Sequence, residues 1–284
     1  MDFLLLIKNG CENLTQTASP SVDALGLHMV LALATITLVW FGVQEALASS
    51  QGGPGFSIGR FMSFFVLITF AYCFVKFYDS QIPAIGYSLK GFVSGGTSSL
   101  VDYIGADSTQ EVQDTVHAAL NKIGTLSPSF TEPYTLLCTY TVQVTLSILT
   151  ALIGVIIAYG AIGATIIGLV GPVFIPWMVF SKTEFLFWGW LKAFIGFEFY
   201  KVVAAATLSV ISHLLITYLT SGAMNADSAS HLIYLMPGLL ILCFVAGFIL
   251  LKIPTMTASL FSGHVGGHGS GMGGLITAAI VRMV

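Results

Sequence analysis

The chain has 284 residues, of which 56% are hydrophobic and only 8% are charged, and its net charge is −3. A soluble globular protein carries about 25% charged residues, so this composition excludes a domain whose whole surface faces water. The few charges are scattered and form no basic patch for nucleic acid. The composition therefore predicts a polytopic membrane protein.

The first part of the chain predicts a polar segment and two spans. Residues 1–24 are polar, and we expect an extracytoplasmic N-terminal segment there. Residues 25–78 contain two apolar runs, Leu25–Leu47 and Phe61–Tyr78, each long enough to cross a bilayer core of about 30 Å at 1.5 Å per residue. The acidic start is atypical of a signal peptide, so we expect the first span to stay uncleaved.

Residues 79–134 predict the one sizeable extramembrane region, an extracytoplasmic segment with amphipathic helices. Ser108–Glu111 is a capping-box pattern before apolar residues at helical spacing, and Gly124 is a candidate C-terminal cap. Upstream, a second apolar stripe could lie against the membrane or a neighbouring subunit. It consists of Ile85, Leu89, Phe92 and Val93.

A run of 46 residues without a charge follows, from Thr135 to Phe180. As a straight helix it would be about 69 Å long, twice what one crossing needs. We expect a helix from Thr135 to about Tyr159 and a broken or re-entrant segment after it, because Gly and Pro then interrupt the run. Small residues at close-packing spacing make this segment a candidate helix-packing and oligomer face; the candidates are Gly160, Ala164, Gly168, Gly171 and Pro172.

Residues 171–200 predict a cytoplasmic aromatic hinge. Three of the four tryptophans flank the polar turn Ser181–Glu184, and lysines follow. Indole rings collect at membrane interfaces, and basic residues prefer the cytoplasmic side, so we expect Phe185–Tyr200 to lie along that interface. The candidate interface and partner-contact residues are Trp177, Lys182, Glu184, Trp188, Trp190, Lys192, Glu198 and Lys201.

Two further spans complete the C-terminal transmembrane cluster, residues 135–251. Val202–Leu219 predicts a crossing outward, and His231–Leu251 predicts a return to the cytoplasm. Residues 252–284 are then a Gly-rich cytoplasmic tail. The fold expected is all-α, with about five transmembrane helices, an extracytoplasmic amino terminus and a cytoplasmic carboxyl terminus, and six crossings stay open as an alternative.

Sequence patterns for catalysis are missing from the chain: it contains no phosphate-binding loop, no HExxH and no GxSxG pattern. We therefore expect no enzyme activity, no cofactor and no metal. His264 and His268 are four apart, but the glycines between them disfavour a helical metal site, so a flexible tail is the simpler interpretation. The scattered cysteines are interpreted as small apolar side chains; they are Cys11, Cys73, Cys138 and Cys243.

A few ionisable residues lie in or near the predicted spans. Glu198 and Lys201 are three apart and can pair on one helical face. His28 and Glu45 lie near the two ends of the first predicted span, and His213 lies in the span Val202–Leu219. A proton or ion pathway needs several such groups to converge, and one histidine per span is little support for one. We interpret these three as polar groups satisfied by neighbouring helices.

Two stretches carry a family resemblance. GPVFIPWMVFSKTEFLFWGWL, from Gly171 to Leu191, resembles the central signature of the TrbL/VirB polytopic inner-membrane proteins of bacterial type IV secretion and conjugation systems. Ile253–Gly263 is similar to that family's pattern at the end of the last span. The chain departs from many relatives by lacking a long hydrophilic C-terminal extension, so contacts made by such an extension are not expected here.

The resemblance implies an inner-membrane core or channel component of a type IV secretion or conjugation machine. Such a protein supports translocation of a DNA–protein or protein substrate and pilus assembly. The implied partners are further copies of the chain, other type IV secretion components including pilus proteins and cytoplasmic ATPases, the lipid bilayer and, transiently, the substrate. The alternatives are a small-solute secondary transporter or ion channel, suggested by the broken run at Gly171–Pro172, and an integral enzyme.

Overall fold

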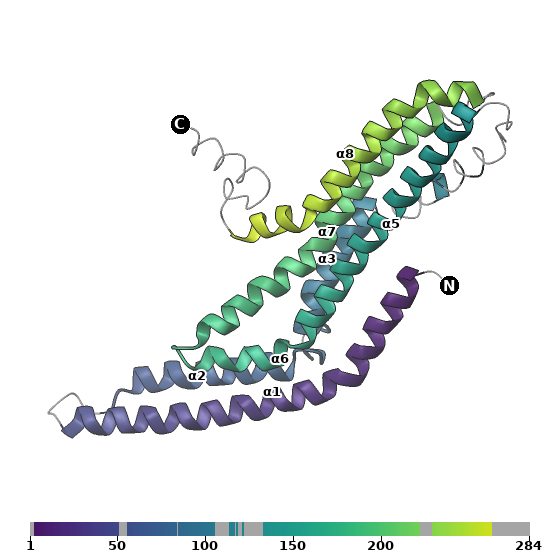
Figure 1. The fold of residues 1–284 in the computed structure, drawn as a ribbon. Helices are drawn as coiled ribbons and strands as arrows, with labels where there is room; N and C mark the ends of the chain where they lie inside the picture. Colours follow the sequence, from purple (N-terminus) through teal and green to yellow (C-terminus); the bar gives the residue numbers. More distant parts are fainter. Residues whose placement is uncertain are drawn as a thin grey trace, which may run out of the picture.

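The computed structural model describes residues 3–50, 56–83, 85–105, 114–116, 118, 121, 133–221 and 229–262. This part of the chain is almost entirely helical and contains no strand (Figure 1). Five of its helices are long and apolar enough to cross a membrane, which confirms the prediction of a polytopic all-α membrane protein. The elements are α1 (Phe3–Ser50), α2 (Ile58–Lys76), α3 (Leu89–Gly105), α5 (Pro133–Leu169), α6 (Gly171–Phe174), the 3₁₀ helix η1 (Ile175–Val179), α7 (Glu184–Ser221) and α8 (Ala229–Ser262).

Helix α1 joins the expected polar segment to the first span without a break. Its 48 residues make it about 72 Å long at 1.5 Å per residue. Pro20 lies inside this helix. The missing N–H and the ring of a proline within a helix bend it at that point. Figure 1 shows the resulting bent helix. The expected boundary at residue 25 is therefore absent from the backbone.

Helices α1 and α2 form an antiparallel hairpin whose buried carboxylate is ion-paired, although Glu45 Oε1 has no hydrogen-bond partner among the described residues. The Glu45 carboxylate lies 3.4 Å from the Arg60 guanidinium and accepts a hydrogen bond from the Ser57 N–H at 3.4 Å. The rings of Phe41 and Phe64 stack across the hairpin with centroids 6.0 Å apart. Glu45 is thus a paired structural group, as the sequence interpretation held.

Helix α5 continues ten residues beyond the expected end at about Tyr159 and stops at Leu169. The expected break itself is confirmed, because α6 and η1 follow as two short elements that begin around Pro172 and Pro176. Each proline lacks the N–H that would continue the ladder. Gly160 does not end the helix, since a glycine inside a helix costs only about 1 kcal/mol and here its face is covered by packing.

Helix α7 is one continuous helix of 38 residues. It joins the expected interfacial segment, Phe185–Tyr200, to the crossing expected from Val202, because no proline interrupts the helix between them. The position of the first part at the membrane interface stays a prediction. Helix α8 likewise runs past Lys252 to Ser262 although it contains Pro237 and Pro254. The helices continue through both predicted boundaries, between Tyr200 and Val202 in α7 and at Leu251 in α8.

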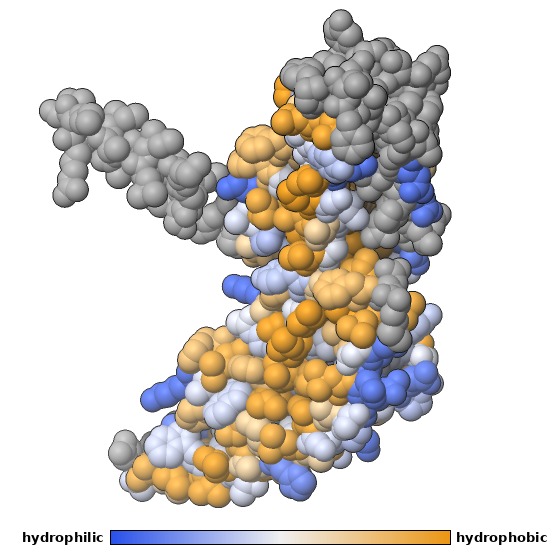
Figure 2. All heavy atoms as spheres, turned by 45° about the vertical axis from the view of Figure 1, so that its right-hand side comes forward, coloured by the Kyte–Doolittle hydropathy of each residue, from blue (hydrophilic) through white to orange (hydrophobic). Residues whose placement is uncertain are grey.

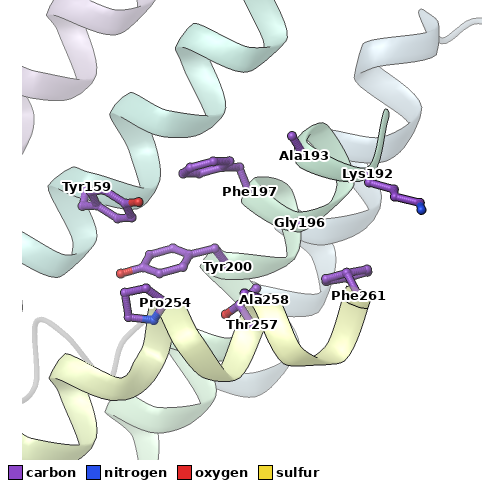
Figure 3. Close-up of a pocket in the computed structure, with 10 residues that line it drawn as sticks. All are labelled: Tyr159, Lys192, Ala193, Gly196, Phe197, Tyr200, Pro254, Thr257, Ala258 and Phe261. Atoms are coloured by element: carbon purple, nitrogen blue, oxygen red, sulfur yellow. The ribbon is translucent and has the colours of Figure 1, made fainter. Parts of the chain in front are cut away.

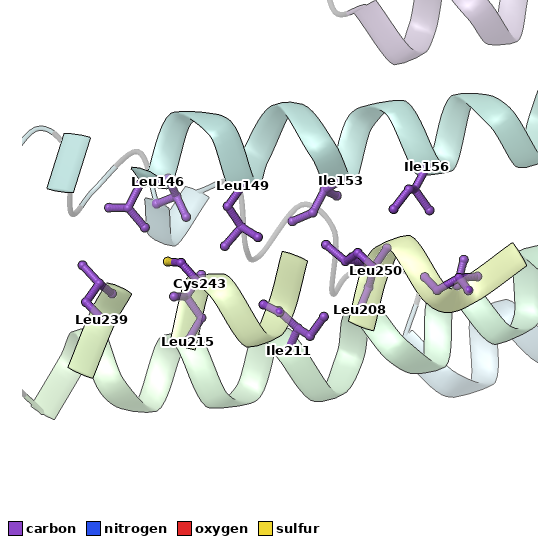
Figure 4. Close-up of a cluster of buried hydrophobic side chains, with 14 of the residues drawn as sticks. Leu146, Leu149, Ile153, Ile156, Leu208, Ile211, Leu215, Leu239, Cys243 and Leu250 are labelled. Carbon is purple, nitrogen blue, oxygen red and sulfur yellow. The ribbon is translucent and has the colours of Figure 1, made fainter. Parts of the chain in front are cut away.

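The buried side chains form two clusters. The first, which we call the bundle cluster, lies between α5, α7 and α8, and Figure 4 shows its interlocking aliphatic side chains. The second, the hairpin cluster, lies between α1, α2, η1 and the first turns of α7. Helix α7 contributes to both: Phe187, Trp190 and Phe194 to the hairpin cluster, and Tyr200, Ala204, Leu208, Ile211, Leu215 and Leu219 to the bundle cluster.

Much of the outer surface is apolar. Figure 2 shows hydrophobic residues over most of the visible face, with hydrophilic residues in separate patches. Large side chains such as Trp40, Phe244 and Val210 are exposed on the long helices. This is the surface expected of helices that contact lipid or other membrane proteins instead of water.

The bundle cluster offers a matched test of packing on one helix. Ile153 of α5 is fully buried, whereas Ile148 of the same helix is 63% exposed. We expect Ile153→Ala to lower the free energy of unfolding by about 2–5 kcal/mol, because it leaves a cavity between three helices. Ile148→Ala should change it within about 0.5 kcal/mol. Unfolding of the detergent-purified protein measures both, and equal effects would contradict the assigned packing.

Candidate functional site

Small residues at the end of α5 and in α6 pack directly against aromatic residues of α7. The pairs, in order along both helices, are Gly160 with Tyr200, Gly163 with Phe197, Gly168 with Phe194, and Gly171 with Trp190. A methyl group added at Gly160 would lie 2.5 Å from the Tyr200 ring. The space over these glycines is therefore filled by the same chain, and they are not open to a second copy. We call this contact the glycine–aromatic interface.

The other two candidates of this group are also buried within the chain. Ala164 is buried on the same helix face. Pro172 is buried against α1, where a methyl group added at Gly26 would lie 2.5 Å from the Pro172 carbonyl oxygen. Gly26 and Gly163 were not selected from the sequence, although both are places where one helix closely approaches another.

Two aromatic donors cap the end of α5. The Trp190 indole N–H donates to the Ile167 carbonyl at 2.9 Å, and the Tyr78 hydroxyl donates to the Gly168 carbonyl at 2.7 Å. The Gly168 carbonyl has no helical partner because Pro172, four residues on, has no N–H. Burial, reinforced by nearby carboxylates of which Asp79 contributes most, raises the pKa of Tyr78 above its usual range, so its hydroxyl stays a donor.

The remaining aromatic and basic candidates lie apart from this cap. Trp177 is half-buried, and Lys182, Glu184, Trp188 and Lys192 are exposed. Glu184 opens α7, where a carboxylate is favoured by the helix dipole. Lys192 lies at the edge of a cavity of about 430 Å³ between α5, α7 and α8, whose other walls include Tyr159, Phe197, Tyr200 and Phe261 (Figure 3).

Glu198 is the buried charge at the junction of the two clusters. It is 4% exposed, and its Oε2 accepts hydrogen bonds from Lys201 Nζ at 2.9 Å and from Thr97 Oγ1 of α3 at 3.1 Å. The pairing of Glu198 with Lys201 agrees with the sequence interpretation. A buried carboxylate is costly unless it is paired and hydrogen-bonded, and here one residue from each of two helices supplies a partner.

A second ionic group lies at the same junction. Lys90 of α3 forms an ion pair with Asp79 at 3.2 Å, and the Ser19 hydroxyl of α1 donates to the other oxygen of Asp79. Asp23 is nearby, and one of its oxygens is buried without a hydrogen-bond partner among the described residues. Together with Lys8 and Glu12 of α1, the charged residues Asp23, Asp79, Lys90, Glu198 and Lys201 and the hydroxyls of Ser19 and Thr97 form what we call the polar waist.

Contacts in the polar waist contradict the prediction that residues 79–134 and Glu198 lie on opposite sides of the membrane. Residues 79–134 were expected outside the membrane and Glu198 on the cytoplasmic side, yet Thr97 and Glu198 are hydrogen-bonded. Residues of the expected extracytoplasmic segment 1–24, Lys8 and Glu12 among them, also line one cavity with Glu198 and Lys201. Groups in contact cannot lie on opposite sides of a core about 30 Å thick. The orientation of the termini stays a prediction, and it must place the polar waist at one level.

Most of the polar waist was not found from the sequence, because its members are widely separated along the chain. The signal that could have found them is their rarity: ionisable residues are few in this chain, and in such proteins they usually have partners. His28 and His213 do not join them. His28 bonds the Ala24 carbonyl in its own helix at 2.7 Å, and His213 is exposed.

The remaining sequence candidates are the cysteines, the histidines of the tail and the capping box. Cys138 and Cys243 are buried, as expected of apolar side chains, while Cys11 is half-buried and Cys73 exposed. Within the described residues, no group of three potential metal ligands is present. His264, His268 and the capping box at Ser108–Glu111 lie outside the described residues.

The glycine–aromatic interface predicts a contrast between two glycines of α5. Gly160→Val should destabilise the protein by about 1–3 kcal/mol, because the new side chain collides with the Tyr200 ring. Gly154, with no atom within 4 Å of its added methyl group, is the control. Gly154→Val should be neutral or slightly stabilising, and thermal unfolding in detergent distinguishes the two. Equal tolerance at both positions would show that the helices do not meet there.

The cap on α5 predicts a contrast between two tryptophans. Trp190→Phe removes the N–H that satisfies the Ile167 carbonyl and should cost about 1–3 kcal/mol, the usual penalty for an unsatisfied buried acceptor. Trp188, two residues away and 52% exposed, is the control, and Trp188→Phe should have little effect. Unfolding midpoints of the two variants are the measurement; a shift in Trp188→Phe as large as that in Trp190→Phe would contradict the cap.

Comparison with known proteins adds the family. The family model described as TrbL/VirB6 plasmid conjugal transfer protein matches residues 34–253, from the middle of α1 into α8. The match includes the Gly171–Leu191 signature, whereas Ile253–Gly263 lies almost wholly beyond it. No curated protein matches the chain. Because the match covers well over half of the 284 residues and five helices can cross a membrane, the chain belongs to the TrbL/VirB6 family and is a multi-pass membrane component of a conjugal transfer or type IV secretion system.

Proposed function

We propose that this protein is a core component of the translocation channel in the bacterial inner membrane, and that it supports both substrate transfer and pilus assembly. The substrate is a DNA–protein complex or a protein. In this proposal the protein itself is not an enzyme, and cytoplasmic ATPases of the same machine supply the energy. It works as a homo-oligomer in contact with those ATPases and with pilus proteins, and it meets the substrate only transiently.

The polar waist is the observation that carries the proposal. Seven charged residues gather where the hairpin and bundle clusters meet, in a chain whose outer surface is otherwise largely apolar. Ionisable residues in a membrane protein are costly and usually face a water-filled cavity, a substrate path or one another. Repeated around a symmetric oligomer, the polar waist would give a hydrophilic ring at one level of the assembly.

The arrangement around the broken segment favours this function over a small-solute transporter. Transporters place the ends of broken helices at a polar binding site near the middle of the membrane. Here Ile175 and Val179 of the broken segment are buried in the hairpin cluster among apolar side chains. The broken segment therefore serves packing against α1, α2 and α7, and we do not propose a solute site there.

Transfer assays test the proposal directly. A strain that lacks the gene should fail to transfer its plasmid and should lose its pili, and the wild-type gene should restore both. Glu198→Gln keeps the side-chain shape but removes the buried charge and weakens its bond to Lys201. We expect this variant to transfer poorly relative to its level in the membrane, which immunoblotting measures.

Glu184→Gln is the matched control, since Glu184 lies on the same helix but is exposed. It should transfer like the wild type. Normal transfer and piliation in the strain without the gene would overturn the proposed function. Normal transfer by Glu198→Gln at equal protein level would show that the proposed function does not depend on the polar waist.

A further inference from the structure

A partly open cavity of about 640 Å³ lies beside the polar waist and has two unlike walls. One wall is apolar and includes Ile7 of α1 together with Ile157 and Ala161 of α5. The other wall carries charged groups from three helices, namely Lys8, Glu12, Lys90, Glu198 and Lys201. A volume of this size is in the range of small-molecule sites, about 300–1,000 Å³. The cavity is thus suited to a ligand that is itself amphipathic.

The charges of this wall are only partly neutralised within the chain. Lys90 and Lys201 each bond one carboxylate, Asp79 and Glu198 respectively. An ammonium group has three donors, so both retain donors for another acceptor. Lys8 and Glu12 lie one helical turn apart on α1, and neither has an ion-pair partner within 4.0 Å among the described residues. The wall therefore presents both spare cationic donors and a spare carboxylate.

We propose that this cavity binds the head group of a zwitterionic phospholipid whose phosphate is accompanied by a primary ammonium. The lysines would hold the phosphate and Glu12, with Glu198 behind it, would hold the ammonium, while the acyl chains follow the apolar wall. A purely anionic head group leaves Glu12 facing a negative charge. A purely apolar ligand leaves the charged wall unpaired, which is unfavourable.

The bound lipid would join the amino-terminal part of α1 to α3, α5 and α7. Lys8 and Glu12 precede residue 34, where the family match begins. The α1 side of the site therefore lies outside the family match, whereas Lys90, Glu198 and Lys201 lie within it. The inference does not depend on the protein being a channel component, because it concerns only what the cavity binds.

Native mass spectrometry of the detergent-purified full chain is the test. The protein is titrated separately with dioleoyl phosphatidylethanolamine, with the corresponding phosphatidylcholine, whose quaternary ammonium has no N–H donor, and with the corresponding phosphatidylglycerol, which has no cation. We expect the first lipid to be retained best. Combining Lys8→Gln and Glu12→Gln should weaken its binding about tenfold or more, as for the loss of about 1.4 kcal/mol.

A matched pair of substitutions controls for charge alone. Lys182→Gln with Glu184→Gln removes the same two residue types from the exposed turn before α7, outside the cavity, and should leave binding unchanged. All four positions are exposed, so both double variants should fold, and size-exclusion chromatography checks this. Equal retention of phosphatidylethanolamine by the two double variants would overturn the site.

Two further outcomes test which lipid head group the cavity binds. Tighter retention of phosphatidylglycerol than of phosphatidylethanolamine, or equal retention of phosphatidylcholine, would overturn the zwitterionic assignment. Competition by inorganic phosphate or soluble phosphoethanolamine distinguishes the source of the phosphate. If phosphoethanolamine competes and phosphate does not, the complete head group is recognised as proposed, and displacement by inorganic phosphate alone would show a simple anion site and overturn the proposal.

Discussion

One uninterrupted helix holds the two halves of the protein together. Helix α7 places its first aromatic turns in the hairpin cluster and its aliphatic turns in the bundle cluster, and Glu198 lies between them. In a membrane, helices associate through close packing and hydrogen bonds more than through the hydrophobic effect. The tightly packed glycines of α5 and the satisfied carboxylate of α7 are therefore the contacts on which the arrangement of the other helices depends.

The same helix explains why polar groups persist in so apolar a chain. Glu198 draws Thr97 of α3 and Lys201 toward one point, and the nearby pair of Asp79 and Lys90 ties α3 to the end of α2. A buried ion pair contributes little net stability against an apolar alternative, but removing one partner is costly. Such pairs fix which helix lies beside which, a choice that apolar packing alone leaves poorly determined.

Sequence reasoning predicted the class, the number of spanning helices and the position of the break, because each follows from local composition or from proline chemistry. It placed the end of α5 too early and divided α7 in two, since glycine and aromatic residues weaken a helix only until tertiary packing covers them. It found the bond between Glu198 and Lys201 because these residues are three apart. Thr97 and Asp79 could not be found in this way, because only the fold brings them to the polar waist. The predicted placement of Thr97 and Glu198 on opposite sides of the membrane was wrong for the same reason.

The two prolines after α5 have a consequence for movement. A break made by glycine can close again into a regular helix, whereas Pro172 and Pro176 lack the N–H groups that an unbroken hydrogen-bond ladder needs. Helix α5 could therefore extend through α6 and η1 only with a bend, like the one at Pro20 of α1. The hydrogen bonds from Tyr78 and Trp190 to the last carbonyls of α5 hold this bend in place. Any displacement of the hairpin relative to the bundle therefore has to break them.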